Sequence, residues 1–452
     1  MKLSSLEIAE ACGVKERQKG GAGRVVTDTR KLRPGDWFLA LKGPNFDGNT
    51  LADQAREKDC AGAVLEHAPR GWDRGLVVVE DGLVALQDCA RAIRRGFGGP
   101  VVGITGSSGK TTTRAMVASV LSQRFSTHQT SGNLNNHIGV PLTLLDLEPN
   151  HEVLVLEMGM SGPGEIALLQ EIGSPTLRLI TNVSLAHSEG SGDLLQTAAC
   201  KEELFAGAQS GDTLIINADD PMVAAMKLPP GTRAVRYGSS TDVDFQLISV
   251  DVDSVKLCTS MVAETPQGRL EVVLPAPGRH IAVDALSAAV IGQELGLSLA
   301  EITRGLEDYR PVGMRMRIEQ LSGGVTLLND AYNANPASTL ASLETLANIR
   351  GRRRIALLGD MLELGAFEVS SHKEVVEAAL ASGIEAVGFV GPRYGAVVEG
   401  CLEEGRVHHT ETSEEMGRWV AGLLQNSDVL LLKGSRGLAM ERVLQELKVL
   451  ED

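Results

Sequence analysis

The sequence of 452 residues is 43% hydrophobic and 22% charged and has a formal net charge of −15, which fits a folded protein of roughly three ordinary domains. The acidic balance and the absence of a long basic run argue against nucleic-acid binding, and no run reaches the roughly 18 apolar residues that a membrane-spanning helix needs. The six cysteines show no CxxC or Cys/His spacing and the first residues do not resemble a secretory signal, so we expect a cytoplasmic protein with reduced thiols.

Short strands and helices are mixed in the first 99 residues. Apolar and β-branched runs predict strands at 24–27, 37–40, 63–65 and 76–79. A helix is expected at 83–95, and the segment 96–100 that follows it contains three glycines and a proline, which is typical of a linker. We therefore predict a small α/β N-terminal domain over residues 1–99.

After residue 100 the pattern changes to strands that alternate with helices. Strands are expected at 101–105, 152–156, 177–182 and 213–217, and a helix is expected at 111–124. Such alternation favours a mostly parallel sheet that is covered by helices. Residues 242–274 then alternate without helices, as in a small antiparallel patch, and a long helix is expected at 281–295. We interpret residues 100–312 as a doubly wound central domain.

The last third of the chain repeats the strand–helix alternation. Strands are expected at 326–330, 354–358, 386–390 and 428–432, and helices at 337–347, 371–382, 413–424 and 438–447. This pattern predicts a C-terminal Rossmann-like domain over residues 313–452. The GxGxxG fingerprint is absent, so we do not expect a dinucleotide bound in the usual way.

A glycine-containing loop between the first central strand and its helix is the strongest functional signal. Residues 101–112 read VVGITGSSGKTT, so a buried strand leads into glycines and then into Lys-Thr at a helix start. Glycines let backbone N–H groups surround phosphate oxygens, and the helix N-terminus adds partial positive charge. The strict GxxxxGK[ST] pattern has glycine where this chain has Ile104, so the loop is a variant, and the weaker alternative is a glycine-rich turn. We expect a nucleotide to bind through Thr105, Gly106, Ser107, Ser108, Gly109, Lys110, Thr111 and Thr112, with Lys110 at the β- and γ-phosphates and the Thr111 hydroxyl on Mg²⁺.

Three further side chains are candidates because of where they stand. Glu157 follows one predicted strand and His187 follows the next, so both would border the crevice at the phosphate loop. A sparse set of protein ligands is enough for Mg²⁺. Each residue has an ordinary alternative: a capping or surface acid for Glu157, a satisfied loop histidine for His187 and a solvated helix lysine for Lys201. From the residues alone, a metal-ligand role and an ordinary role are equally favoured for Glu157. The ordinary role is favoured for His187 and Lys201.

Several ordered motifs resemble the Mur ligase family over essentially the whole chain. Residues 105–111 resemble that family's TGxxGKT loop. In the family's order there follow NLNNHIGVP at 133–141, EMG at 157–159, GEI at 164–166, NV at 182–183, AH at 186–187, KEE at 201–203 and NADD at 217–220. The last third adds DAYNANP at 330–336, LGDMLELG at 358–365, His372 and KGSR at 433–436. The resemblance implies three α/β domains and an ATP-dependent ligase.

Two of these motifs, YNANP and LGDMLELG, resemble the branch of the family that adds D-alanyl-D-alanine to UDP-N-acetylmuramoyl-tripeptide. The implied reaction activates a carboxylate with ATP as an acyl phosphate, which the dipeptide amine attacks, and it gives the pentapeptide, ADP and phosphate. It belongs to peptidoglycan precursor synthesis and hence to cell wall biogenesis, cell shape and cell division. The implied partners are the two substrates, without nucleic acid or membrane insertion, and a monomer is expected. Diaminopimelate and lysine remain open for the third residue of the tripeptide.

Two alternatives to this function remain open. One is a ligase of the same class that adds a single amino acid, or an enzyme similar to folylpolyglutamate synthase. The other is a phosphate-loop switch or motor, which would hydrolyse nucleotide without an amine acceptor and would leave the motifs of the last third without a role.

The resemblance also implies residue roles that spacing alone does not give. It implies catalytic roles for Lys110, Lys201, His187, Glu157 and Arg315. It implies two Mg²⁺ sites formed by Thr111, Glu157, His187 and Lys201, the lysine being carbamylated by CO₂. ATP contacts are implied for Arg315 at the phosphates, Asp330 at the ribose and Asp284 on the adenine side. Substrate contacts are implied for Thr29, Arg30 and Asp47 in the domain for the UDP-sugar, for Asn135 in the domain for ATP, and for Asn333, Asn335, Asp360 and Glu363 in the domain for the dipeptide and part of ATP.

The chain departs from the family pattern in two places. The family often has histidine after the Asp-Gly of the first domain, whereas Asn49 follows Gly48 here. The adenine-side motif of the family usually reads GRHNxxNA, and this chain reads GRHIAVDA at 278–285, so Ile281 and Asp284 replace both asparagines. An asparagine amide donates and accepts hydrogen bonds, whereas an ionised Asp284 could only accept. Adenine selectivity is therefore not settled by the motif.

Overall fold

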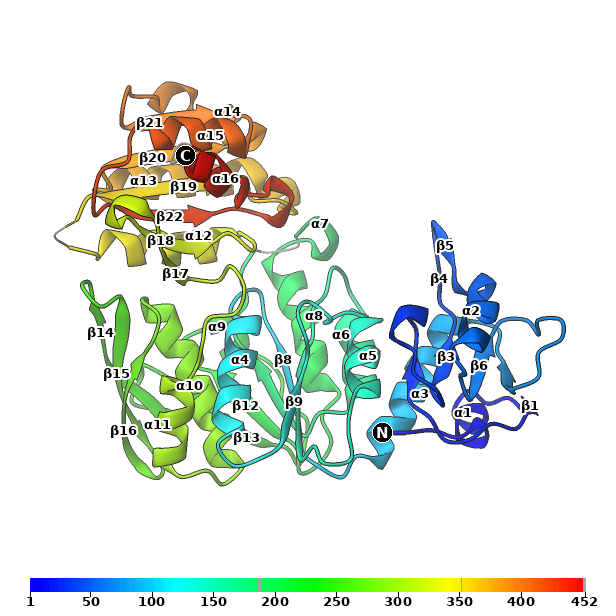
Figure 1. Cartoon of the computed structure of the whole chain (residues 1–452). Coiled ribbons are helices and arrows are strands. Elements are labelled where there is room, and N and C mark those ends of the chain that lie inside the picture. Colours follow the sequence, from blue (N-terminus) through cyan, green and yellow to red (C-terminus); the bar gives the residue numbers. More distant parts are fainter. Residues whose placement is uncertain (186–187, 351, 450–452) are drawn as a thin grey trace.

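The computed structural model of the chain describes residues 1–185, 188–350 and 352–449 and contains three α/β domains (Figure 1). Each domain is built around its own sheet. The N-terminal domain lies to one side of the central domain, and the C-terminal domain lies above it in the view of Figure 1. Among the described residues, no helix combines the length and the apolar character that crossing a bilayer requires.

The N-terminal domain has a five-stranded sheet in the order β1-β7-β6-β3-β2. Its elements are α1 (Ser5–Ala11), β1 (Glu16–Gln18), β2 (Val25–Val26), η1 (Thr29–Lys31), β3 (Trp37–Leu39), β4 (Lys42–Gly43), β5 (Phe46–Asp47), η2 (Gly48–Leu51), α2 (Ala52–Glu57), β6 (Gly62–Leu65), β7 (Gly75–Val78) and α3 (Gly82–Gly96). Trp37 is fully buried, and its ring occupies the space that side chains at Gly62 and Gly75 would need. The four strands and the helix predicted here are confirmed to within one residue at each end.

The central domain has a nine-stranded sheet in the order β16-β15-β14-β13-β12-β11-β8-β10-β9. Its strands are β8 (Val101–Thr105), β9 (Thr127–Gln129), β10 (Val153–Glu157), β11 (Leu177–Ile180), β12 (Thr213–Asn217), β13 (Arg233–Gly238), β14 (Phe245–Asp253), β15 (Cys258–Thr265) and β16 (Gly268–Leu274). The pairs from β9 to β14 are parallel, and the predicted antiparallel patch is confirmed as β14, β15 and β16, which extend the same sheet. Because β8 lies between β10 and β11, the carboxyl ends of these three strands meet at one edge.

Helices cover both faces of this sheet. They are α4 (Lys110–Leu121), α5 (Gly139–Leu145), α6 (Glu165–Gly173), α7 (Ser188–Ser191), α8 (Leu194–Ala206), α9 (Pro221–Ala224), α10 (Arg279–Glu294) and α11 (Leu299–Glu307). The helices predicted at 111–124 and 281–295 are confirmed as α4 and α10, although α4 ends three residues earlier than expected. The phosphate-loop helix α4 packs against α10 and α11, which fixes its position below the cavity described in the next section.

Gly305 brings α11 into backbone contact with α4. A methyl group at Gly305 would lie 2.4 Å from Val120 Cα and 2.9 Å from Ser119 O. Alanine ordinarily stabilises a helix by about 1 kcal/mol over glycine, but these backbone atoms can move only if the helices separate. We therefore expect Gly305→Ala to lower the free energy of unfolding by about 1–3 kcal/mol, as overpacking does. Urea denaturation of this variant and of the control Gly400→Ala, which has nothing within 4 Å, measures the difference; equal stability of the two would contradict the contact.

The C-terminal domain has a six-stranded sheet in the order β17-β18-β22-β19-β20-β21. Its elements are β17 (Arg317–Gln320), η3 (Ser322–Gly324), β18 (Thr326–Asp330), α12 (Pro336–Ala347), β19 (Arg354–Gly359), η4 (Gly365–Phe367), α13 (Glu368–Ala381), β20 (Ala386–Val390), α14 (Pro392–Val398), η5 (Glu399–Cys401), β21 (Val407–Thr410), α15 (Ser413–Ala421), β22 (Val429–Lys433), η6 (Arg436–Leu438) and α16 (Arg442–Val449). All pairs except β17–β18 are parallel. The predicted start of the helix at 438–447 is wrong. Ala439 has a φ of 47°, which a right-handed helix does not accommodate, so η6 ends before it and α16 begins only at Arg442.

Candidate active site

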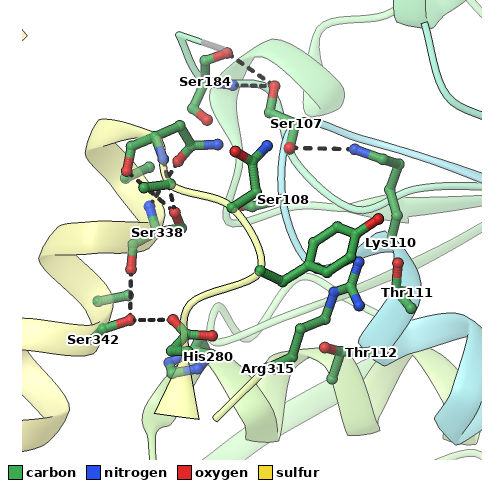
Figure 2. A pocket seen from close by; sticks show the side chains of 18 of the residues that line it. Ser107, Ser108, Lys110, Thr111, Thr112, Ser184, His280, Arg315, Ser338 and Ser342 are labelled. Carbon is green, nitrogen blue, oxygen red and sulfur yellow. Dashed lines mark hydrogen bonds between the residues drawn. The ribbon is translucent and has the colours of Figure 1, made fainter. Parts of the chain in front are cut away.

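A cavity of about 800 Å³ lies between the central and C-terminal domains. The central domain contributes the phosphate loop, the start of α4 and residues at the carboxyl ends of β10 and β11. The C-terminal domain contributes the end of β18, the start of α12, Lys433 at the end of β22 and residues 435–437 after it. The cavity therefore lies at the edge of a parallel sheet where α/β proteins commonly bind ligands. Figure 2 shows the two walls facing each other.

The phosphate loop, residues 106–109, joins β8 to α4. Gly106 and Gly109 have φ angles of 152° and 79°, and a methyl group at Gly106 would lie 1.8 Å from Thr181 Oγ1, so only glycine fits there. The Lys110 ammonium donates to Gly106 O at 2.6 Å and to Ser107 O at 3.3 Å, the second bond being drawn in Figure 2, and burial lowers its pKa. Residues 107–112 line the cavity, whereas Thr105 lies behind them in β8.

The segment after β11 is hydrogen-bonded to the phosphate loop. Ser108 N and Oγ both donate to Asn182 Oδ1, at 3.0 and 3.1 Å. Ser107 exchanges hydrogen bonds with the backbone of Ser184, at 2.9 Å in both directions. These bonds leave the loop little freedom to change shape, and the backbone N–H groups of Ser107 and Ser108 both donate to Asn182.

Glu157 is the buried acid of the cavity. It ends β10, is 2% exposed, and its Oε2 accepts from Thr111 Oγ1 at 2.9 Å while its Oε1 accepts from Asn135 Nδ2 at 2.8 Å. Arg114, one turn beyond Thr111 on α4, is 3% exposed and lies 3.5 Å from Glu157 Oε2. The carboxylate is thus compensated by a cation and oriented toward the phosphate loop.

The oxygens of Thr111 and Glu157 fit a magnesium ion. Two hard oxygen donors 2.9 Å apart supply the one or two protein ligands that Mg²⁺ takes alongside phosphate and water. Within residues 1–185, 188–350 and 352–449 no group of three or more His, Cys, Asp and Glu side chains gathers as a metal site, so a cage of protein ligands is not expected there. His187, the other ligand that the resemblance implies, lies outside the described residues.

Lys201 is not the solvated lysine that the helix pattern alone favours. It is 1% exposed on α8, and burial, with the charge of Lys110 as a smaller cause, lowers its pKa to about 7. A helix lysine in contact with water would keep a pKa near 10.4. The lysine therefore spends a large part of its time as a neutral amine near pH 7, which is the nucleophilic form of this side chain.

Charged side chains of the third domain line the opposite wall. Arg315 lies with its guanidinium carbon 3.6 Å from the centre of the Tyr332 ring. Asp330 ends β18 and accepts from Lys433 Nζ at 2.6 Å and from Ser342 Oγ at 2.8 Å. Since Lys433 ends the neighbouring strand β22, this ion pair forms where the two strands end together.

The start of α10 closes the cavity on another side. His280 and Asp284 both line it. Burial lowers the pKa of His280 to about 4 and raises the pKa of Asp284 to about 7. Asp284 is therefore partly protonated near neutral pH, and its protonated form can donate as well as accept a hydrogen bond.

Three of the substrate residues expected in the third domain line the cavity. Asn333 and Asn335 follow β18, and the Asn335 side chain caps α12 by accepting from Ser338 N at 2.8 Å. Glu363 has a φ of 64°, and its carbonyl oxygen accepts from Glu189 N of α7 at 3.2 Å. The loop that carries Glu363 therefore joins the third domain to the central one.

Asp360 does not line the cavity. Its side chain is fully buried and accepts hydrogen bonds from the backbone N–H groups of Arg393 at 3.0 Å and Tyr394 at 2.9 Å, at the start of α14. The structure thus corrects the expectation of a substrate contact. Asp360 instead anchors the strand end from which the loop of residues 361–365 departs.

The substrate residues expected in the first domain lie elsewhere. Thr29, Arg30 and Asp47 are absent from the lining of the cavity. Thr29 is mostly buried, Arg30 is exposed and paired with Asp28, and Asp47 accepts from Asn49 N at 2.9 Å. Their contact with a nucleotide-sugar stays a prediction.

Sequence reasoning did not select several side chains that complete the site. Arg114 stands three residues after Thr111, a spacing that places two helical residues on one face. Lys433 is the first charged residue after an apolar run. It begins the KGSR motif at 433–436, but the motif does not predict a role for it. Tyr332, on whose ring the Arg315 guanidinium stacks, likewise lies inside the DAYNANP motif at 330–336.

Known proteins are similar to nearly the whole chain. Residues 104–292 match the Mur ligase middle domain, and residues 314–436 match the Mur ligase, glutamate ligase domain. The UDP-N-acetylmuramoyl-tripeptide–D-alanyl-D-alanine ligase of Escherichia coli (strain K12) is 38% identical over 426 residues, which cover 94% of this chain and 93% of that protein. The ligase of the same name from Bacillus subtilis (strain 168) is 34% identical over 436 residues, covering 94% and 92%.

Solved structures agree with these sequences. MurF from Acinetobacter baumannii has a TM-score of 0.91 at 28% identity over 99% of both chains. MurF ligase from Thermotoga maritima in complex with ADP has a TM-score of 0.84 at 27% identity, covering 94% of this chain and 97% of that one. Folylpolyglutamate synthase of Mycobacterium tuberculosis, at 16% identity and a TM-score of 0.65, shares the fold alone. With relatives above 30% identity along almost its full length and both domain types in order, the chain belongs to the Mur ligase family.

Proposed function

We propose that the chain is an ATP-dependent ligase that joins D-alanyl-D-alanine to UDP-N-acetylmuramoyl-tripeptide in peptidoglycan precursor synthesis. The names of relatives that match over nearly their full lengths support this substrate pair. The observation that carries the proposal is the meeting of the phosphate loop, the Thr111–Glu157 pair and the Arg315 guanidinium at one cavity. A switch or motor would give the third-domain wall no role.

The first chemical task is to bring two anions together. A carboxylate condenses with an amine only when its oxygen becomes a good leaving group, and transfer of the γ-phosphoryl group of ATP supplies one. Lys110 and Arg315 contribute positive charge where the carboxylate approaches the γ-phosphate, and positioning with charge stabilisation is most of what phosphoryl transfer needs. Mg²⁺ held by Thr111 and Glu157 would neutralise phosphate charge further.

The second task is attack on the acyl phosphate. The amine of the dipeptide adds to the carbonyl carbon, the carbon–oxygen bond to phosphate then breaks, and inorganic phosphate leaves while the amine loses its proton. The chain's part is to hold the two substrates in line and to keep water away. The cavity suits this task because its two walls come from the central and C-terminal domains, so that groups held by each wall face one another.

A second magnesium site would involve Lys201 and His187. A neutral amine can add to CO₂, and the carbamate that forms has two oxygens that serve as metal ligands. Burial, which lowers the pKa of Lys201 to about 7, supports this modification by increasing the neutral fraction.

We assign the remaining substrate contacts by domain. Residues 1–99 would hold the UDP-sugar through Thr29, Arg30 and Asp47, residues 100–312 would hold ATP and the substrate carboxylate near Asn135, and residues 313–452 would hold the dipeptide through Asn333, Asn335 and Glu363 and the ribose through Asp330. We also propose cytoplasmic action as a monomer. All six cysteines are free thiols, which agrees with a reducing compartment.

Phosphate release with and without acceptor tests the function. With ATP, magnesium and UDP-N-acetylmuramoyl-tripeptide, we expect steady release only after D-alanyl-D-alanine is added, because the acyl phosphate needs an amine. Free D-alanine, L-lysine or glutamate in place of the dipeptide provides the control. Turnover with a single amino acid would identify a related ligase instead, and steady hydrolysis without any acceptor would favour a switch.

A further inference from the structure

Asp284 is a buried acid that the proposed chemistry does not use. It lies on α10, is 9% exposed and lines the cavity. A methyl group at Gly109 would lie 2.8 Å from its Oδ1, so the carboxyl group lies directly against the phosphate loop at the residue before Lys110. The family motif that this segment resembles has an uncharged asparagine at the same place.

The cations of α4 are turned toward other partners. The Lys110 ammonium donates to Gly106 O, and Arg114 pairs with Glu157. Among the described residues, no lysine, arginine or histidine forms an ion pair with Asp284. The acid therefore has no positive neighbour to hold its charge.

The other elements around Asp284 offer no positive charge either. On its own helix His280 is neutral near pH 7, because burial lowers its pKa to about 4. Arg315 stacks on Tyr332 across the cavity. The phenols of Tyr237 on β13 and Tyr309 after α11 lie close enough to Asp284 to interact with its charge, and the acids Asp219 and Asp220 after β12 lie near Tyr237. Burial raises the pKa of both phenols, so they stay uncharged.

These surroundings favour the protonated acid. Burial raises the pKa of Asp284 to about 7, and the neighbouring Thr113 hydroxyl opposes this only in part. An ionised carboxyl at Gly109 would also repel any phosphate bound by the loop, so the phosphate would raise the pKa further. A protonated carboxyl regains the donor that an asparagine amide has.

We propose that Asp284 acts as an uncharged carboxylic acid beneath the phosphate loop and that nucleotide binding takes up a proton at this residue. The inference rests on the proposed use of ATP and adds a pH-dependent determinant of nucleotide affinity. The direction of the pH dependence follows from the negative charge of the ionised Asp284 carboxyl. Below the pKa of Asp284 nucleotide binds without cost, and above it the Kd rises by up to tenfold for each pH unit because a proton must be bound first.

Titration calorimetry of the full chain with ADP and magnesium tests this. Measurements at pH 8.5 in two buffers of different ionisation enthalpy give the number of protons taken up, and the Kd is followed from pH 6.5 to 8.5. We expect the wild type to take up protons when ADP binds and Asp284→Asn not to do so. The two proteins should have equal Kd values at pH 6.5. At pH 8.5 the Kd of Asp284→Asn should be about tenfold lower than that of the wild type, which lies within the limit of tenfold per pH unit. Subtracting the variant from the wild type removes the contribution of Lys201, which both proteins share.

Wild-type proton uptake and pH dependence that persist in Asp284→Asn would overturn the inference. Infrared difference spectra of the wild type give a second measurement, which does not depend on how the variant folds: the carbonyl band of a protonated carboxylic acid should grow when ADP binds at pH 8.5, and its absence would overturn the inference as well. Failure of the wild type to bind ADP at any pH would instead contradict the proposed function, on which the inference rests.

Discussion

The Lys110→Met variant is expected to lose about 10³-fold in kcat, the upper end of the range for removing one preorganised donor from developing charge. Lys110 is the cation that the phosphate loop itself supplies, and its ammonium already lies at the loop carbonyl of Gly106. Methionine keeps the length of the side chain and removes only the charge and the hydrogen bonds. Phosphate release at saturating substrates measures the loss.

The matched control for this prediction is Lys256→Met. Lys256 is an exposed lysine in the turn between β14 and β15 of the same domain, and it lies outside the cavity. We expect full activity from the control and similar melting temperatures for both variants. A Lys110→Met enzyme within a few-fold of the wild type would mean that the loop does not hold the reacting phosphates.

The Lys201→Ala variant is expected to lose about 10²-fold or more in kcat, since substitutions around a metal site typically cost 10–100-fold even when the ligands themselves remain. Short carboxylic acids such as acetate should restore part of the activity. Alanine leaves the space of the buried lysine empty, and a small carboxylate that enters it would supply the oxygens of the proposed carbamate. Phosphate release as a function of acetate concentration measures the rescue.

Lys201→Met separates this role from simple packing. The thioether fills the same volume, so we expect an inactive variant that acetate does not restore. Loss of activity in both variants with no rescue in either would indicate that Lys201 supports the structure of α8 only. Full activity of Lys201→Ala without any acid would remove the residue from the site.

Buried inner strands could be predicted closely because their signal is local. The runs at β8, β12, β18 and β20 were expected at the residues where they are found, since each is a short apolar segment that ends in a polar or glycine-containing turn. The edge strands β17 and β21 were missed. They carry arginine, glutamate, glutamine or histidine and are only partly buried, so nothing in their sequence distinguishes them from loops.

The site was predictable where it depends on strand ends and less so elsewhere. Glu157 could be placed near Thr111 because parallel strands end at one edge of a sheet. The burial of Lys201 could not, since it depends on how α8 packs in the folded domain, which helical periodicity does not report. Asp360 was misjudged because a motif shows that a residue is near a site and not whether its side chain points there.

The first domain contributes no described side chain to the cavity in which the phosphate chemistry is proposed. With the UDP-sugar held by residues 1–99, as proposed, the molecule would keep its energy-coupling part and its recognition part as separate modules. Sequence drift in the recognition module can then alter which sugar carrier is accepted while the geometry around the terminal phosphate stays as it was. Such independence explains how one architecture accommodates enzymes that extend chemically different building blocks.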